Sequence, residues 1–197
     1  GANDVVLKNI IFTNGNLVGS NNQFAINGAG IYNTGSNLVL DNCEITNCSI
    51  TSNYVCEVNG VIYSNKKISM SNCVLKSNKA CSYYTGVGNG FGVRLMVFEG
   101  SIVNCTVQNN FVFSGVAMAT GISMYGSLTN RVSNVKFINN TVRTISGIAY
   151  GGAIQILGVV TNCTFNNNSA IADNNESHAG ALCFKPGTKV SNCTFIG

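Results

Sequence analysis

The chain has few charged residues, one proline, one histidine and no tryptophan. Only 9% of its 197 residues are charged, against roughly 25% in an average soluble domain. The net charge of +4 is scattered, and Lys66-Lys67 is the sole adjacent basic pair, so no clustered basic face for nucleic acid is expected. With one histidine and no Cys-x-x-Cys pair, we predict no metal site and no cofactor.

Long apolar runs are missing as well. No stretch of about 20 consecutive apolar residues occurs, so no membrane span is predicted. A basic, apolar-centred leader is also not seen. The apolar share of 45% argues against a disordered chain. The length suits one ordinary domain, and we expect a single domain over residues 1–197 with no linker.

What the chain has is a repeat. A phrase of Asn, a small apolar residue (usually Cys), any residue and a large apolar residue occurs seven times. The copies follow one another at steps of 28 to 33 residues and begin at Asn9, Asn42, Asn72, Asn104, Asn134, Asn162 and Asn192. A Gly-rich phrase, such as Gly151-Gly152-Ala153-Ile154, lies between them six times. A fixed period in this range predicts a stacked-repeat architecture.

Within each repeat the apolar residues alternate as they do in short β-strands. Val190 and Cys193 are three residues apart, yet both fit a core position. A bend at Asn192 reconciles them, because asparagine tolerates the left-handed backbone region. We therefore expect a buried ladder of hydrogen-bonded amides at one corner, formed by Asn42, Asn72, Asn104, Asn134, Asn162 and Asn192.

The predicted fold class is all-β: a single-stranded right-handed parallel β-helix (β-solenoid) of about six to seven coils of about 30 residues. Each coil should hold three strands, namely the Gly-rich phrase, the strand before the Asn corner and the strand after it. A variable loop, for example residues 47–59 or 169–179, should follow the third strand.

Nine cysteines could indicate a disulfide scaffold. Five of them occupy the small apolar position after the corner Asn, where Ile10 and Val135 also occur, and we interpret these five as free thiols that fill the core. Cys48, Cys56 and Cys81 fall in the predicted loops of neighbouring coils and are candidates for one disulfide. The sequence does not choose the pair.

The two phrases together also resemble a known family. Gly151-Gly152-Ala153-Ile154 is followed by Phe165-Asn166-Asn167-Asn168, and Phe137-Ile138-Asn139-Asn140 is a second full copy of the latter phrase. This pairing resembles the repeats of chlamydial polymorphic membrane proteins and the Asn-Cys-Thr-Phe repeats of adhesin-like surface proteins in methanogenic archaea. The resemblance covers essentially the whole chain. It implies a right-handed parallel β-helix outside the cell that acts in adhesion.

The alternative function is that of a polysaccharide lyase or hydrolase of the pectin-lyase-like β-helix class. Such chemistry needs clustered carboxylates, and the chain has seven acidic residues. Asp41 and Glu44 flank one Asn corner with outward parity, but the neighbouring coils supply no acidic partner. Asp173, Glu176 and His178 form the other candidate group, which we interpret as a polar surface loop. We predict no enzyme and no catalytic residues.

The two ends of the predicted stack are apolar. Nothing in the sequence resembles a cap, and an open rung exposes unpaired strand groups and the core cross-section. We expect self-association, head to tail, or contact with flanking repeats of a longer chain. The residues expected at these ends are Val5, Leu7, Ile10, Phe12, Val190, Cys193 and Phe195.

The loops are the other expected contact surface, for a protein or glycan of a host or a neighbouring cell. They span residues 48–57, 80–89 and 169–178, and the contact residues expected in them are Tyr54, Tyr83, Tyr84, Asp173, Glu176 and His178. The sequence thus predicts an extracellular, non-catalytic, adhesin-like β-solenoid of the cell surface whose ends are able to stack into a filament.

Overall fold

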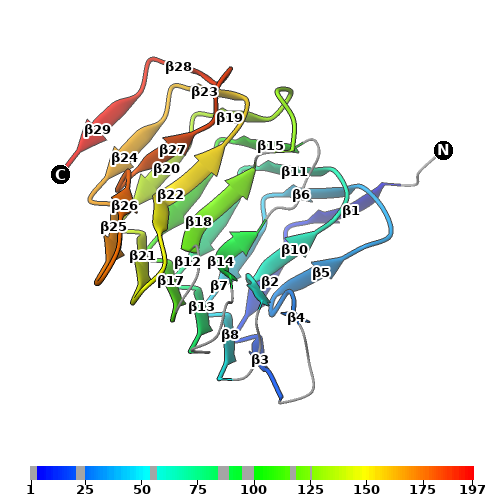
Figure 1. Cartoon of the computed structure of the whole chain (residues 1–197). Coiled ribbons are helices and arrows are strands. Elements are labelled where there is room, and N and C mark those ends of the chain that lie inside the picture. The colour runs from blue at the N-terminus through cyan, green and yellow to red at the C-terminus, as the bar shows by residue number, and fades with distance from the viewer. Residues whose placement is uncertain are drawn as a thin grey trace.

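The structure is a computed structural model that describes residues 4–20, 25–53, 57–83, 89–94, 100–115, 119–124 and 126–197. These residues form short strands and turns, and no helix occurs among them, so none is present that could span a membrane. Neighbouring strands come from successive repeats and pair in parallel. The expected parallel β-solenoid is confirmed (Figure 1).

Two sheets of seven strands flank the predicted corner. The first sheet contains the strands before it: β1 (Val5–Lys8), β6 (Leu38–Asp41), β11 (Ile68–Ser71), β15 (Gly100–Val103), β19 (Arg131–Ser133), β23 (Val159–Thr161) and β28 (Lys189–Ser191). The second sheet contains the strands after it: β2 (Ile11–Thr13), β7 (Glu44–Thr46), β12 (Val74–Lys76), β16 (Thr106–Gln108), β20 (Lys136–Ile138), β24 (Thr164–Asn166) and β29 (Thr194–Ile196).

Two further sheets complete each coil. The third sheet has six strands: β3 (Asn16–Val18), β8 (Ser49–Ser52), β13 (Lys79–Ser82), β17 (Phe111–Ser114), β21 (Thr141–Thr144) and β25 (Ser169–Ala172). The fourth contains the Gly-rich phrases: β4 (Ala25–Ile26), β5 (Ile31–Asn33), β9 (Glu57–Asn59), β10 (Ile62–Ser64), β14 (Asn89–Arg94), β18 (Ala119–Met124), β22 (Ala149–Ile156), β26 (Ser177–His178) and β27 (Leu182–Phe184).

The third sheet was not expected, and it occupies segments that the sequence pattern assigned to variable loops. Its cause is a second corner, five residues after the first, where the chain again takes positive φ. The residues at this corner are Asn14, Asn47, Ser77, Asn109, Asn139 and Asn167, with φ of 51° to 58°. The coil therefore turns twice on left-handed residues, and its strands form four sheets rather than three.

The first corner is where the sequence placed it. Its seven asparagines have φ of 51° to 56° and lie one above another, because the strands on both sides keep register from coil to coil. Their burial, however, was predicted wrongly: all of these side chains are exposed. In the left-handed conformation the side chain points away from the core, and the small residue that follows points inward.

A second ladder lies just inside the second corner, with Asn78 and Asn140 buried and Asn110 and Asn168 half-buried; we call it the buried ladder. The Nδ2 group of Asn140 donates to Val107 O and to Asn168 Oδ1, both at 2.9 Å. Its Oδ1 accepts from Nδ2 and from the backbone N–H of Asn110, at 3.0 and 3.2 Å. The last Asn of the Phe-x-x-Asn phrase is therefore the one that satisfies buried backbone groups.

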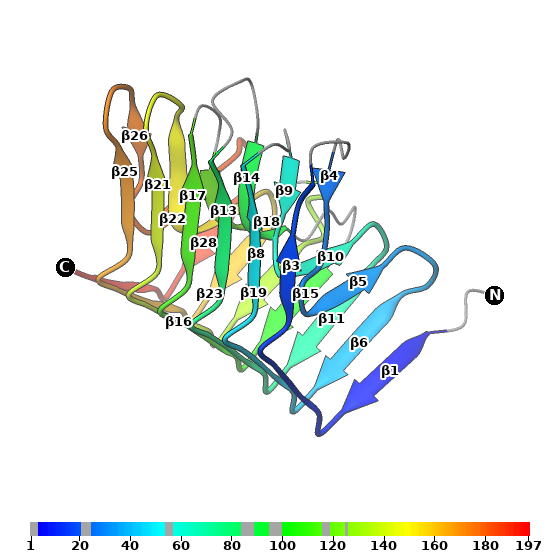
Figure 2. The same cartoon turned by 90° about the horizontal axis from the view of Figure 1, so that it is seen from below.

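The core lies between the first, second and fourth sheets and is built from stacked like residues. Leu40, Ile45 and Ile62 are fully buried, and the rings of Phe137, Phe165 and Phe195 stack at 4.9 Å with 4° between planes. The third sheet packs on the start of the fourth as a thinner arm, seen in Figure 2 as the row of upright strands from β25 to β3. A small cluster of Val112, Val142 and Ala149 fills this arm.

Candidate functional site

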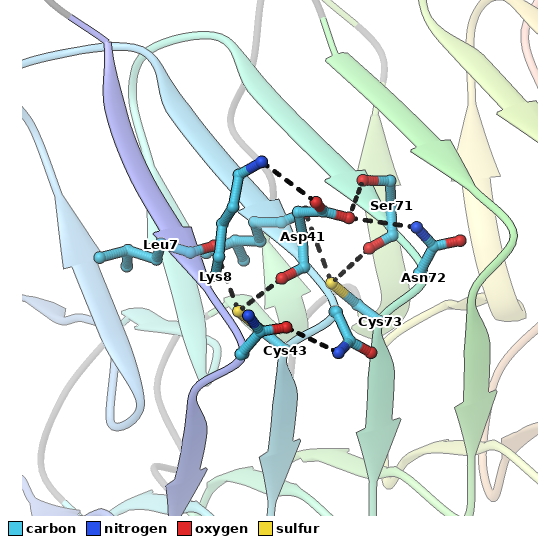
Figure 3. Close-up of polar contacts among 10 residues, drawn as sticks. Leu7, Lys8, Asp41, Cys43, Ser71, Asn72 and Cys73 are labelled. Carbon is cyan, nitrogen blue, oxygen red and sulfur yellow. Dashed lines mark hydrogen bonds and ion pairs between the residues drawn. The ribbon is translucent and has the colours of Figure 1, made fainter.

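At the first corner, the carboxylate of Asp41, at the end of β6, brings together groups from three coils. Its Oδ1 accepts from Ser71 Oγ at 2.9 Å and from Asn72 Nδ2 at 3.1 Å, and Lys8 Nζ lies 3.4 Å from its Oδ2. Figure 3 shows these three groups converging on the carboxylate. The hydrogen bonds from Asn72 and Ser71, together with Lys8, lower the pKa of Asp41 below its ordinary value.

The exposed asparagines of the first corner form partial hydrogen-bonded contacts along their column, which we call the exposed ladder, and the carboxylate of Asp41 interrupts it. Asn42 Nδ2 donates to Asn9 Oδ1 at 2.8 Å, and Asn134 Nδ2 donates to Asn104 Oδ1 at 3.1 Å. Asn72, which by the same pattern would donate to Asn42, donates to Asp41 instead. Within the described part of the chain, Asn42 Oδ1 consequently receives no hydrogen bond.

A surface groove of about 290 Å³ lies beside this break, on the outer side of the second sheet. Asn9, Asn42 and Asn72 lie along it, and the outward residues of three successive strands, Ile11, Glu44 and Val74, stand in register beside them. Cys43 is the seventh lining residue. Glu44 is half-buried between two apolar neighbours and, among the described residues, has no hydrogen-bond or ion-pair partner.

The predicted acidic loop near the C-terminus splits into two separate contacts. Asp173 forms a bidentate pair with Arg143, at 2.9 Å from Nη2 to Oδ2. Glu176 Oε2 lies 3.0 Å from His178 Nε2, and the His178 ring stacks on Tyr150 at 5.2 Å. Asp173, Glu176 and His178 are all exposed, and each carboxylate already has a partner.

The remaining predicted contact residues are tyrosines. Tyr83 is exposed and packs against Phe113, with ring centroids 5.1 Å apart. Tyr54 and Tyr84 lie outside the described residues. The loops expected at 48–57 and 80–89 begin with strand residues, so Ala80 is a core residue rather than a loop residue.

The residues predicted at the two ends lie on the terminal rungs. Phe195 is 54% exposed, whereas Phe165 directly beneath it in the column is 1% exposed. Val5, Ile10 and Val190 are also exposed, while Leu7, Phe12 and Cys193 are half-buried. β1 and β2 at one end and β28 and β29 at the other each pair with a single neighbouring strand.

The cysteine prediction was right for one group and wrong for the other. The thiols after the first corner are free, and each donates to the carbonyl two residues before it, for example Cys163 Sγ to Thr161 O at 3.2 Å. Burial raises the pKa of Cys163 to about 11. Cys48 and Cys81 are also free and buried, because they belong to the second corner and the third sheet rather than to loops. Cys56 lies outside the described residues.

The arrangement offers little metal chemistry. No group of three His, Cys, Asp or Glu residues in the described ranges could hold a metal ion. What the described surface offers is an interrupted amide ladder, a groove with one unpartnered carboxylate, and two apolar end rungs. No family model, curated protein or solved structure matches the chain.

Proposed function

We propose that the protein is a non-catalytic, adhesin-like structural β-solenoid of the cell surface whose end rungs are covered by further solenoid rungs. The observation that carries this proposal is the contrast between end and interior residues of one column, such as Phe195 and Phe165. The resemblance to surface-protein repeats supports the extracellular location. The engagement of Asp41 and Asp173 by basic and amide groups supports a non-catalytic role.

A second copy stacked head to tail would continue the existing columns. In continuous register, Phe12 of one molecule would lie on Phe195 of the next, and Leu7 would lie on Val190. Such a contact extends the column of stacked rings that ends at Phe195, and it pairs β28 with β1 and β29 with β2. Covering the exposed half of Phe195 would contribute about 1–1.5 kcal/mol.

Sedimentation velocity and electron microscopy of the purified chain test the proposal. We expect short stacks that grow with concentration and that are lost in Phe195→Lys, which places a charge in the joint. Leu128→Lys is the matched control, because Leu128 is 60% exposed on the turn before β19 and is not part of the terminal strands β1, β2, β28 and β29. Strictly monomeric particles at millimolar concentration, or equal assembly of both variants, would refute head-to-tail stacking.

The adhesive role is tested separately. Cells that display the chain should bind host or neighbouring cells or immobilised glycans, and trimming residues 173–178 should reduce that binding. Unchanged binding after trimming argues against a role for this loop. Turnover of a pectin-like polysaccharide that is abolished by Asp173→Asn would instead support the lyase or hydrolase alternative.

A further inference from the structure

The groove beside Asp41 has a chemistry that the proposed function does not use. It lies on the side of the solenoid and spans three coils, of which the first, with Asn9 and Ile11, is the terminal rung that a stacked copy would adjoin. Its floor and walls combine two apolar side chains, Ile11 and Val74, with the carboxylate of Glu44 between them. Ile11 is 66% exposed.

Two acceptors along this groove have no donor among the described residues. Glu44 has no partner among the described residues, and Asn42 Oδ1 has lost the donor that the ladder pattern would have given it. Asp41 does not share this property, because Ser71, Asn72 and Lys8 already occupy its two oxygens. Lys8 is held at Asp41 and is not paired with Glu44.

We propose that this groove binds a basic side chain, foremost arginine, presented by an extended segment of a partner protein. The methylene groups of arginine would lie against Ile11 and Val74, as long basic side chains commonly cover apolar surface. The guanidinium would donate to the Glu44 carboxylate and to Asn42 Oδ1. Guanidinium has only donors, which match these two acceptors.

Charge complementarity favours this partner over an acidic one. The groove contains one of the seven acidic residues of the chain, half-buried and without a counter-ion among the described residues. A half-buried carboxylate is under-solvated, so a cation that neutralises it gains more than at an open surface. An anionic or phosphorylated segment would be repelled at the same place.

The test is an NMR titration of the whole chain with the peptide acetyl-Gly-Arg-Gly-amide. We expect saturable shifts confined to amides around Ile11, Asn42, Glu44 and Val74, with a dissociation constant on the order of millimolar for so small a ligand. The peptide with citrulline in place of arginine keeps the shape without the charge, and it should bind about tenfold more weakly.

Glu44→Gln keeps the size of the side chain and should weaken arginine-peptide binding by about five- to tenfold. Glu176→Gln is the matched control, since Glu176 is an exposed glutamate that pairs with His178 outside the groove. Equal binding of the citrulline peptide, unchanged affinity in Glu44→Gln, or shifts scattered over the solenoid would each overturn the proposal. Binding is measured at a concentration at which the chain is monomeric, so that no stacked copy adjoins Ile11.

Discussion

Replacing Asn140 by alanine tests the role of the buried ladder. Asn140 is 2% exposed, and its amide makes four hydrogen bonds, with Val107 O, Asn168 Oδ1 and two groups of Asn110. Alanine removes all four and leaves the carbonyl of Val107 and the N–H of Asn110 without these partners. Each buried group left unpaired costs roughly 1–3 kcal/mol.

The structure also limits this loss. A void of about 10 Å³ lies beside Asn110 and Asn140, so after truncation a water molecule can enter and replace part of the lost bonding. We therefore expect Asn140→Ala to lower the free energy of unfolding by about 3 kcal/mol, near the lower limit for two to three orphaned groups. That is a large fraction of the 5–15 kcal/mol typical of a folded domain.

Urea denaturation followed by circular dichroism measures this change, and two variants control it. Asn139→Gly removes an exposed amide one residue away at φ 52°, which glycine adopts readily, so its effect should stay within about 0.5 kcal/mol. Asn140→Cys mimics Cys48, whose thiol lies 3.8 Å from Phe12 O at the same ladder position, and should be milder than alanine. A loss below about 1 kcal/mol in Asn140→Ala, or one equal to that of Asn139→Gly, would refute the reasoning.

Three further predictions follow from the site and the core. The hydrogen bonds from Asn72 and Ser71, together with Lys8, lower the pKa of Asp41. The ionised carboxylate therefore stabilises the fold above its ordinary pKa of about 3.9, and this contribution is lost as the pH falls through the lowered value. Between pH 5 and pH 2, the melting temperature should fall more for the wild type than for Asp41→Asn. In native protein treated with iodoacetamide at about pH 8, the half-buried Cys183 should be modified before the buried Cys163, and equal rates by peptide mapping would contradict the burial. Phe165→Ala should cost about 3–5 kcal/mol in chemical denaturation, because its ring stacks on two others; a loss under about 1 kcal/mol would show that the column is not a packed core.

The sequence is sufficient to predict the repeat period, the first corner and the columns of residues that point into the core. Cys163 and Phe165 follow Asn162 at fixed spacing in every repeat, and this spacing by itself places them inside. The second corner is harder to predict because its residues differ: Ser77 adopts φ 55° at a position where the other coils have Asn. A propensity argument does not select serine for the left-handed region.

The groove at Asp41 also could not be located from the sequence. The alternation of inward and outward residues along the strands correctly predicts that Asp41 and Glu44 lie on the outer surface. The sequence alone, however, suggests for them only the role of a catalytic carboxylate pair. Whether Asn72 donates to Asn42 or to Asp41 depends on side-chain geometry across two strands, since both acceptors lie one rung away. That choice decides which oxygen remains without a donor, and only coordinates reveal it.

The two asparagine columns have different physical roles, and this difference indicates where binding surfaces can vary. The exposed column supplies residues that accept positive φ, so its side chains are not needed for stability and are able to exchange partners, as Asn72 does. The buried column supplies hydrogen bonds that the core requires. Beside the exposed column, the outward residues of the second sheet change freely from coil to coil while the inward ones stay apolar. A specific contact on the side of this solenoid is therefore most easily built where a break in the exposed ladder meets an unusual outward residue, and the position of Glu44 beside Asn42 meets both conditions.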